Sequence, residues 1–219
     1  QPFKGGFIGV DIFFVISGYL ITSIILYELK LNGNFSFQYF YQRRIRRIIP
    51  VFFVVMIFST ILAWIYLPPS RLIEFSKSIL YSIGFGSNYY FYESGLNYFE
   101  FEGLFIPFLH SWSLSVEEQY YIIFPILLLI FFKYSKRFLP IILIAGVIIS
   151  LFLADYGSKS SPSITFYFIH TRMWELLAGS LLAYFEINLG RKSSSNISNQ
   201  IMPFVGLLLI FLSLLLFYD

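Results

Sequence analysis

The chain has 219 residues, of which 58% are hydrophobic and only 12% are charged, and its mean hydropathy is +0.74. Soluble domains carry about 25% charged residues, so the composition excludes an ordinary soluble protein and indicates a polytopic membrane protein. The net charge of +3 comes from clustered basic residues, a pattern that suits the positive-inside rule of membrane proteins better than binding to nucleic acid. The chain has no cysteine and only two histidines, so it offers few ligands for a metal site.

Apolar stretches of membrane-spanning length follow one another along the chain. A spanning helix needs about 20 mostly apolar residues. Stretches that reach or approach this length are 7–27, 48–67, 119–132 (or from about 115), 138–154, 174–187 (or from about 171) and 202–218. The stretch 79–92 is short and rich in glycine and tyrosine, so it is doubtful as a span. We predict an all-α membrane bundle of about six to seven helices, forming one transmembrane domain over 1–219 that is partial at both ends.

The basic residues predict the orientation of these helices. They gather in three loops, 28–47, 133–137 and 191–192, which the positive-inside rule places on the cytoplasmic face. All three loops lie on one face only if 79–92 does not cross the membrane. The charge pattern therefore favours a re-entrant or interfacial element there, with the acidic stretch 93–102 facing outward.

Four arginines stand just before the second apolar stretch. On a helix, Arg44 and Arg47 share one face, and Arg43 and Arg46 form a second pair. A guanidinium group presents a fixed fork of donors that suits phosphates, so these residues are candidates for binding an anionic, nucleotide-bearing donor. The alternative is a topological anchor at lipid headgroups, which is the commoner role of basic flanks.

The first apolar stretch carries a carboxylate, Asp11. Such a group is costly in the membrane and is usually paired or functional, although the dipole of a nearby helix N-terminus eases the cost and leaves a capping role open. Ser17 and Gly18 are small, so they permit a neighbouring helix to approach closely. Packing explains this pair more readily than catalysis does.

Glu117 has two interpretations. Ser113 or Ser115 followed by Glu117 and Glu118 is typical of a helix N-cap with acidic residues in the first turn. Alternatively, Glu117 enters the membrane edge, with Tyr121 one turn further on the same face, and does acid–base work.

Two further polar positions are candidates for a site. His110 is either a proton shuttle or a structural hydrogen-bonding residue. Arg172 and Glu175 lie three residues apart at the start of an apolar helix and can form an ion pair.

In residue content and in order along the chain, these motifs resemble those of membrane acyltransferase family 3, the O-acetyltransferases that modify cell-surface glycans. The matching motifs are Gly-Gly-Phe-Ile-Gly-Val-Asp-Ile-Phe-Phe-Val-Ile-Ser-Gly-Tyr at 5–19, Phe40-Tyr41 with Arg44-Ile45-Arg46-Arg47-Ile48-Ile49-Pro50, His110-x-Trp112-x-Leu114-x-x-Glu117-x-x-x-Tyr121-x-x-x-Pro125, and Arg172-x-Trp174-Glu175-x-x-x-Gly179.

The resemblance implies transfer of an acetyl group from cytoplasmic acetyl-CoA to a hydroxyl of a surface or lipid-linked glycan, by an enzyme of the bacterial inner membrane. It implies that the arginine cluster binds acetyl-CoA and that Glu117 is catalytic with His110 in support. It also implies that the main catalytic histidine lies upstream of residue 1, so that the 219 residues alone are inactive. The residues expected to shape the cavity are Asp11, Ser17, Trp112, Tyr121, Arg172 and Glu175.

Lipopolysaccharide O-antigen, peptidoglycan, capsule or exopolysaccharide, and small glycosides all remain open as acceptors. One rival hypothesis is a transporter or lipid-binding membrane protein without catalytic activity, in which the arginines bind headgroups and Asp11, Glu117 and Arg172 line a permeation path. A second rival is a structural scaffold whose charges serve only topology and helix pairing.

Overall fold

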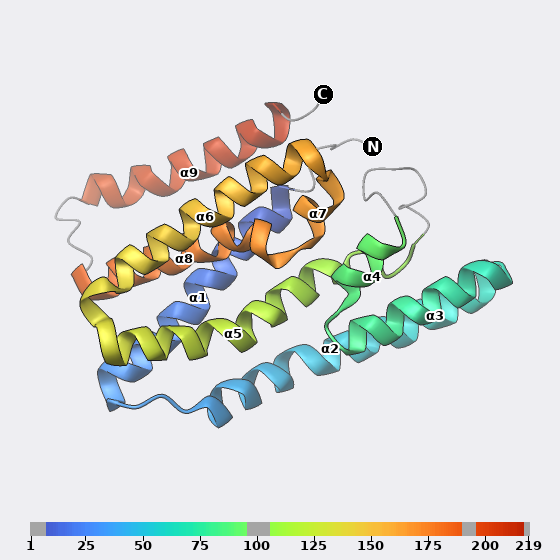
Figure 1. Ribbon diagram of the computed structural model, residues 1–219, viewed down its shortest axis with the longest axis horizontal. Coiled ribbons are helices and arrows are strands. Elements are labelled where there is room, and N and C mark those ends of the chain that lie inside the picture. The colour runs from blue at the N-terminus through green and yellow to red at the C-terminus, as the bar shows by residue number, and fades with distance from the viewer. Residues whose placement is uncertain (1–7, 96–105, 190–195, 217–219) are drawn as a thin grey trace.

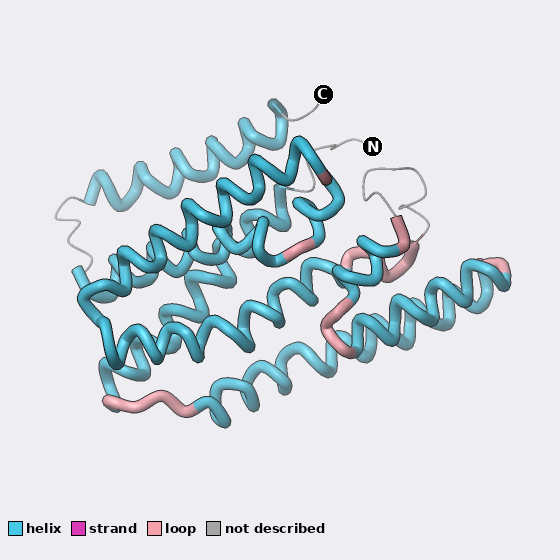
Figure 2. Tube along the Cα trace, in the orientation of Figure 1, coloured by secondary structure: helices cyan, strands magenta, loops and turns pink. Residues whose placement is uncertain are grey.

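The computed structural model describes residues 8–95, 106–189 and 196–216, and in these ranges the chain is built from helices joined by short turns (Figures 1 and 2). The predicted all-α membrane bundle is confirmed. The long helices correspond to the six predicted spans: α1 (Ile8–Asn32), α2 (Phe37–Tyr66), α5 (Ser111–Ser135), α6 (Leu139–Ser160), α8 (Ile169–Leu189) and α9 (Asn196–Leu216).

Four of these helices, α1, α2, α5 and α6, are long and apolar enough to cross a membrane, which makes the chain a multi-pass membrane protein. In α9 the apolar segment, Ile201–Ser213, is shorter. In α8 the apolar sequence is interrupted by Arg172, Glu175 and Glu186.

The second span begins earlier than the sequence predicted. The stretch 28–47 was expected to be a loop, but α2 starts at Phe37 and contains all four arginines. Ser36 caps this helix, because its Oγ accepts a hydrogen bond from the backbone N–H of Tyr39 at 3.3 Å. The arginines therefore project from a helix that continues into the apolar span.

The doubtful stretch 79–92 is divided between two short helices, α3 (Pro69–Ile83) and α4 (Ser87–Glu93), in place of one spanning helix. The break falls at Gly84-Phe85-Gly86, where Phe85 has a φ of 52°, an unusual value for a residue with a side chain. After α2 the chain turns back along it in α3, and α5 then starts from the right-hand part of the bundle (Figure 1).

This arrangement gathers the basic segments at one end of the bundle. The start of α2 and the connection between α5 and α6 both lie at the left of Figure 1, as the charge pattern predicted for a non-crossing 79–92. The third basic segment, 191–192, and most of the acidic stretch 93–102 lie outside the described residues, as does the Gly-Gly-Phe at 5–7.

Helices α1 and α8 form the tightest contact in the bundle, at two glycines. A Cβ atom at Gly18 would overlap the main chain of Leu176, and one at Gly179 would overlap the carbonyl oxygen of Val15. The predicted close approach of a helix at Gly18 is therefore confirmed. This contact fixes the register between α1 and α8, and with it the position of the polar side chains that both helices carry.

We expect Gly18→Ala to destabilise the protein by about 2 kcal/mol, because the added methyl group meets backbone that cannot rotate away. Thermal unfolding in detergent measures the effect. The control is Gly9→Ala on the same helix, where a Cβ meets nothing within 4 Å. That change should be neutral or stabilising, since alanine favours helix. Equal unfolding temperatures for the two variants would contradict the role of Gly18.

Candidate active site

A buried carboxylate, Glu117, lies at the junction of α1 and α5, where only 5% of the residue is exposed. Its Oε1 accepts a hydrogen bond from the Ser17 hydroxyl at 2.5 Å and a second, short one from the Tyr121 hydroxyl. Oε2 receives no hydrogen bond from the described residues. One oxygen of Glu117 is thus held by the fold, while the other is left for a ligand or a proton.

Local helix geometry explains one of these contacts. Tyr121 lies one turn after Glu117 on α5, so the predicted shared face is confirmed. The N-cap interpretation is wrong, because α5 already starts at Ser111 and both Ser113 and Ser115 lie inside it. The hydroxyl of Ser115 pairs with that of Ser87 at 2.7 Å and is not available to cap a helix end.

Arg44 extends from α2 to this carboxylate site. Its Cζ lies 3.3 Å from the centre of the Tyr121 ring, and its NH1 lies 3.8 Å from Glu118 Oε1. The Tyr41 hydroxyl donates to the backbone carbonyl of Tyr121 at 3.1 Å, which fastens α2 to α5 at the same level. The side chain of Arg44 is 18% exposed, so it is partly withdrawn from solvent.

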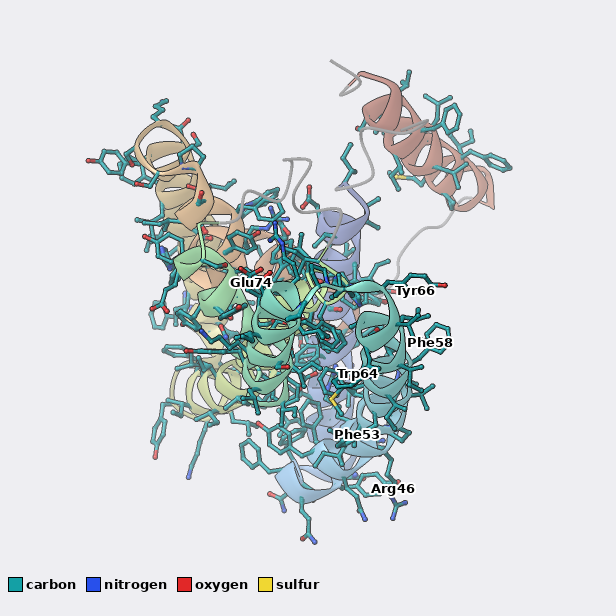
Figure 3. All side chains as sticks on the ribbon, turned by 90° about the vertical axis from the view of Figure 1, so that its right-hand side faces the viewer. Arg46, Phe53, Phe58, Trp64, Tyr66 and Glu74 are labelled. Atoms are coloured by element: carbon teal, nitrogen blue, oxygen red, sulfur yellow. The ribbon has the colours of Figure 1, made fainter. Side chains whose placement is uncertain are left out.

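The other arginines of α2 are more exposed. Arg43 lies 3.9 Å from Glu28 and over the ring of Tyr39, while Arg46 and Arg47 are exposed. Figure 3 shows Arg46 at the end of α2 opposite to Tyr66. The start of α2 therefore combines one arginine inserted beside Tyr121 with three that face outward from the bundle.

A second polar cluster joins α1 to α8. Arg172 donates to Asp11 in a short hydrogen bond, and its Nε lies 3.2 Å from Glu175 Oε1. Rings of Phe14, Trp112 and Phe166 surround the guanidinium, with their centres 5.5–5.7 Å from its Cζ.

The predicted Arg172–Glu175 pairing is confirmed. Asp11 lies in the first turn of α1, as expected, and it is paired with Arg172. The cluster is compact and mostly buried, and Glu175 Oε2 has no hydrogen-bond partner among the described residues.

The structure does not bring His110 to Glu117. His110 is exposed at the start of α5, where its ring lies 5.8 Å from that of Phe108. It lies seven positions before Glu117, which corresponds to about 10 Å along a helix axis.

A polar contact that the sequence did not predict fastens the α3–α4 break to α5. The Gln119 amide donates to the carbonyl of Phe85 at 2.9 Å and to Asn88 Oδ1 at 3.0 Å. Asn88 in turn donates to the Tyr167 carbonyl at 3.2 Å. Glycines around Phe85 were the only signal in the sequence, and they indicated a break without identifying its partner.

Fold and site together define a multi-pass membrane protein with a buried, hydrogen-bonded carboxylate beside an arginine-rich helix start. A family model described as an acyltransferase domain matches residues 4–219. The chain belongs to this family, membrane acyltransferase family 3.

Relatives in this family are substantially similar in sequence. The chain is 37% identical over 185 residues to the peptidoglycan O-acetyltransferase OatA of Listeria monocytogenes, covering 83% of this chain and 30% of the relative. It is 40% identical to the putative peptidoglycan O-acetyltransferase YrhL of Bacillus subtilis, covering 82% and 29%. An uncharacterized protein of Haemophilus influenzae is 36% identical, covering 94% of this chain and 86% of the relative.

The chain thus spans about 30% of the length of the two relatives named for peptidoglycan. No solved structure matches it.

Proposed function

We propose that the protein transfers an acetyl group from acetyl-CoA on the cytoplasmic side of the bacterial inner membrane to a hydroxyl group of a cell-envelope glycan. Membership of the acyltransferase family and the names of two relatives support O-acetylation of a glycan. These names also make peptidoglycan the first acceptor to test. Neither the family nor the names of these relatives support the rival transporter hypothesis.

The observation that carries this proposal is the contact between the arginine-rich start of α2 and the Glu117 site. Arg44 stacks on Tyr121, and Tyr121 donates to Glu117. A group that suits phosphate and a group that suits proton transfer therefore meet around one tyrosine ring. Binding of the acetyl donor by Arg44 and proton transfer at Glu117 would therefore be linked through Tyr121.

In the proposed reaction the acceptor hydroxyl attacks the thioester carbonyl of acetyl-CoA. The new O–C bond forms, the C–S bond breaks, and the hydroxyl proton ends on the sulfur of CoA. Glu117 Oε2 would hold this proton or orient the base that takes it. Ser17 and Tyr121 keep the carboxylate in a single orientation while the proton moves.

On the donor side, we assign the arginines two roles. Arg47 is exposed one turn after Arg44 and would contact the phosphates of acetyl-CoA directly. Arg44 would contact the part of the donor that approaches Tyr121. Asp11, Arg172 and Glu175 would keep α1 and α8 together and so hold Ser17 in place.

Arg47→Ala tests the donor site. Because Arg47 is exposed, the variant should fold normally, while transfer of acetyl label from acetyl-CoA to envelope glycan should fall at least about tenfold, the loss expected for a charge-assisted contact of roughly 1.5–3 kcal/mol. The assay uses membranes that contain the full-length protein. Arg71→Ala, which removes an arginine from α3, is the control. Activity of Arg47→Ala within a few-fold of wild type would contradict the donor role.

A further inference from the structure

An apolar groove separates α5 and α6 on the side away from the arginine helix. The two helices are joined at one end by the turn Lys136–Phe138 and diverge from there, with α8 behind them (Figure 1). The groove between the three helices has a volume of about 150 Å³. Its lining is apolar apart from Tyr120, whose hydroxyl is already paired with that of Ser180 at 2.8 Å.

The groove is closed inside and open towards the lipid. Its mouth includes Ile123 and Leu127 of α5, which are 48% and 43% exposed, and its floor includes the buried Leu143 and Leu177. Gly146 contributes to the space, because a Cβ there would come within 2.8 Å of a Leu177 methyl group. A concave apolar surface of this size suits a segment of an extended hydrocarbon chain.

Positive charge lies at one end of the groove. Lys133, Lys136 and Arg137 are all exposed at the corner between α5 and α6, beside the lining residues Phe131 and Leu139. From residue 119 to residue 154 the sequence contains no acidic residue. None of the three basic residues forms an ion pair within the parts of the chain that the structure describes. They are therefore available to an external anion.

We propose that this groove binds one acyl chain of an anionic phospholipid from the cytoplasmic leaflet, with the lipid phosphate at the basic corner. A phospholipid carries a negative group at headgroup depth and an apolar chain below it. The protein matches this arrangement, because the positively charged corner would face the lipid phosphate and the apolar groove would face the acyl chain. This order favours a phospholipid over a protein helix, which would bring no negative charge to the corner. The proposal does not depend on the proposed acetyl transfer.

Native mass spectrometry of the full-length protein in detergent tests the site, with phosphatidylglycerol and phosphatidylcholine of identical acyl chains as probes. We expect phosphatidylglycerol to bind preferentially. Each basic residue near a membrane surface contributes roughly fivefold in affinity for anionic lipid, so Lys136→Gln/Arg137→Gln should weaken phosphatidylglycerol binding by about 25-fold. The control is Arg71→Gln/Lys77→Gln, which removes the same two kinds of charge from α3.

A second pair of variants tests the groove itself. Ile123→Trp/Leu127→Trp places two indole rings in the mouth and should reduce the bound lipid severalfold. Ile122→Trp/Ile126→Trp makes the same change at residues of α5 that are 50% and 46% exposed but do not line the groove, and it should leave binding unchanged. Equal binding of the two lipids, equal losses in both tryptophan pairs, or preferential binding of a polyprenyl phosphate would overturn the proposal.

Discussion

Glu117→Gln is expected to reduce acetyl transfer at least about 100-fold, the lower end of what a positioned acid–base group contributes. Glutamine has the shape of glutamate and retains an oxygen that accepts hydrogen bonds from Ser17 and Tyr121, so the α1–α5 junction should persist. It cannot take up a proton at the second position. The measurement is transfer of acetyl label in membranes that contain equal amounts of each full-length variant.

Glu74→Gln provides the matched control, because it makes the same change at an exposed carboxylate of α3. It should retain wild-type activity. Transfer by Glu117→Gln within tenfold of wild type would assign Glu117 a structural role and would remove it from the proposed reaction.

Arg172→Met should lower the free energy of unfolding by about 4 kcal/mol, since removing one partner of a buried ion cluster leaves charge uncompensated. Glu175, which is 2% exposed, and Asp11 would both lose their cation. Denaturation in mixed detergent micelles gives the comparison with the parent protein.

Arg71→Met is a close control for this change, because Arg71 also pairs with a glutamate three residues along its helix, but on an exposed surface. It should change stability by less than about 1 kcal/mol. Adding Asp11→Asn and Glu175→Gln to Arg172→Met should recover part of the loss. Equal losses for Arg172→Met and Arg71→Met would mean that the cluster does not stabilise the fold.

The sequence predicted the positions of the long helices more successfully than the residues at which they begin. Apolar length located every long helix, because the requirement for about 20 apolar residues acts on the local sequence. The start of α2 was misplaced because its four arginines were taken as a loop, although Ser36 is a typical N-cap. The start of α5 was misplaced for a similar reason, since several serines precede Glu117 and each is a possible cap.

The candidate site could be predicted only in part. Glu117 and Tyr121 are one turn apart, as are Arg172 and Glu175, so helix geometry alone brings each pair together. The contact of Ser17 with Glu117 spans 100 residues, and that of Asp11 with Arg172 spans 161. Such contacts depend on how α1 packs against α5 and α8, which no local pattern specifies.

The weak attachment of α2 has a consequence for motion. Only three of the 30 residues of α2 are buried, compared with seven of 25 in α1. Among the four helices long and apolar enough to cross a membrane, the arginine helix therefore has the least packing to lose if it tilts, whereas α1 and α8 are locked together at Gly18 and Gly179. Entry and departure of a large anionic donor could be accommodated by displacement of α2 alone, which would leave the Ser17–Glu117 contact undisturbed from one turnover to the next.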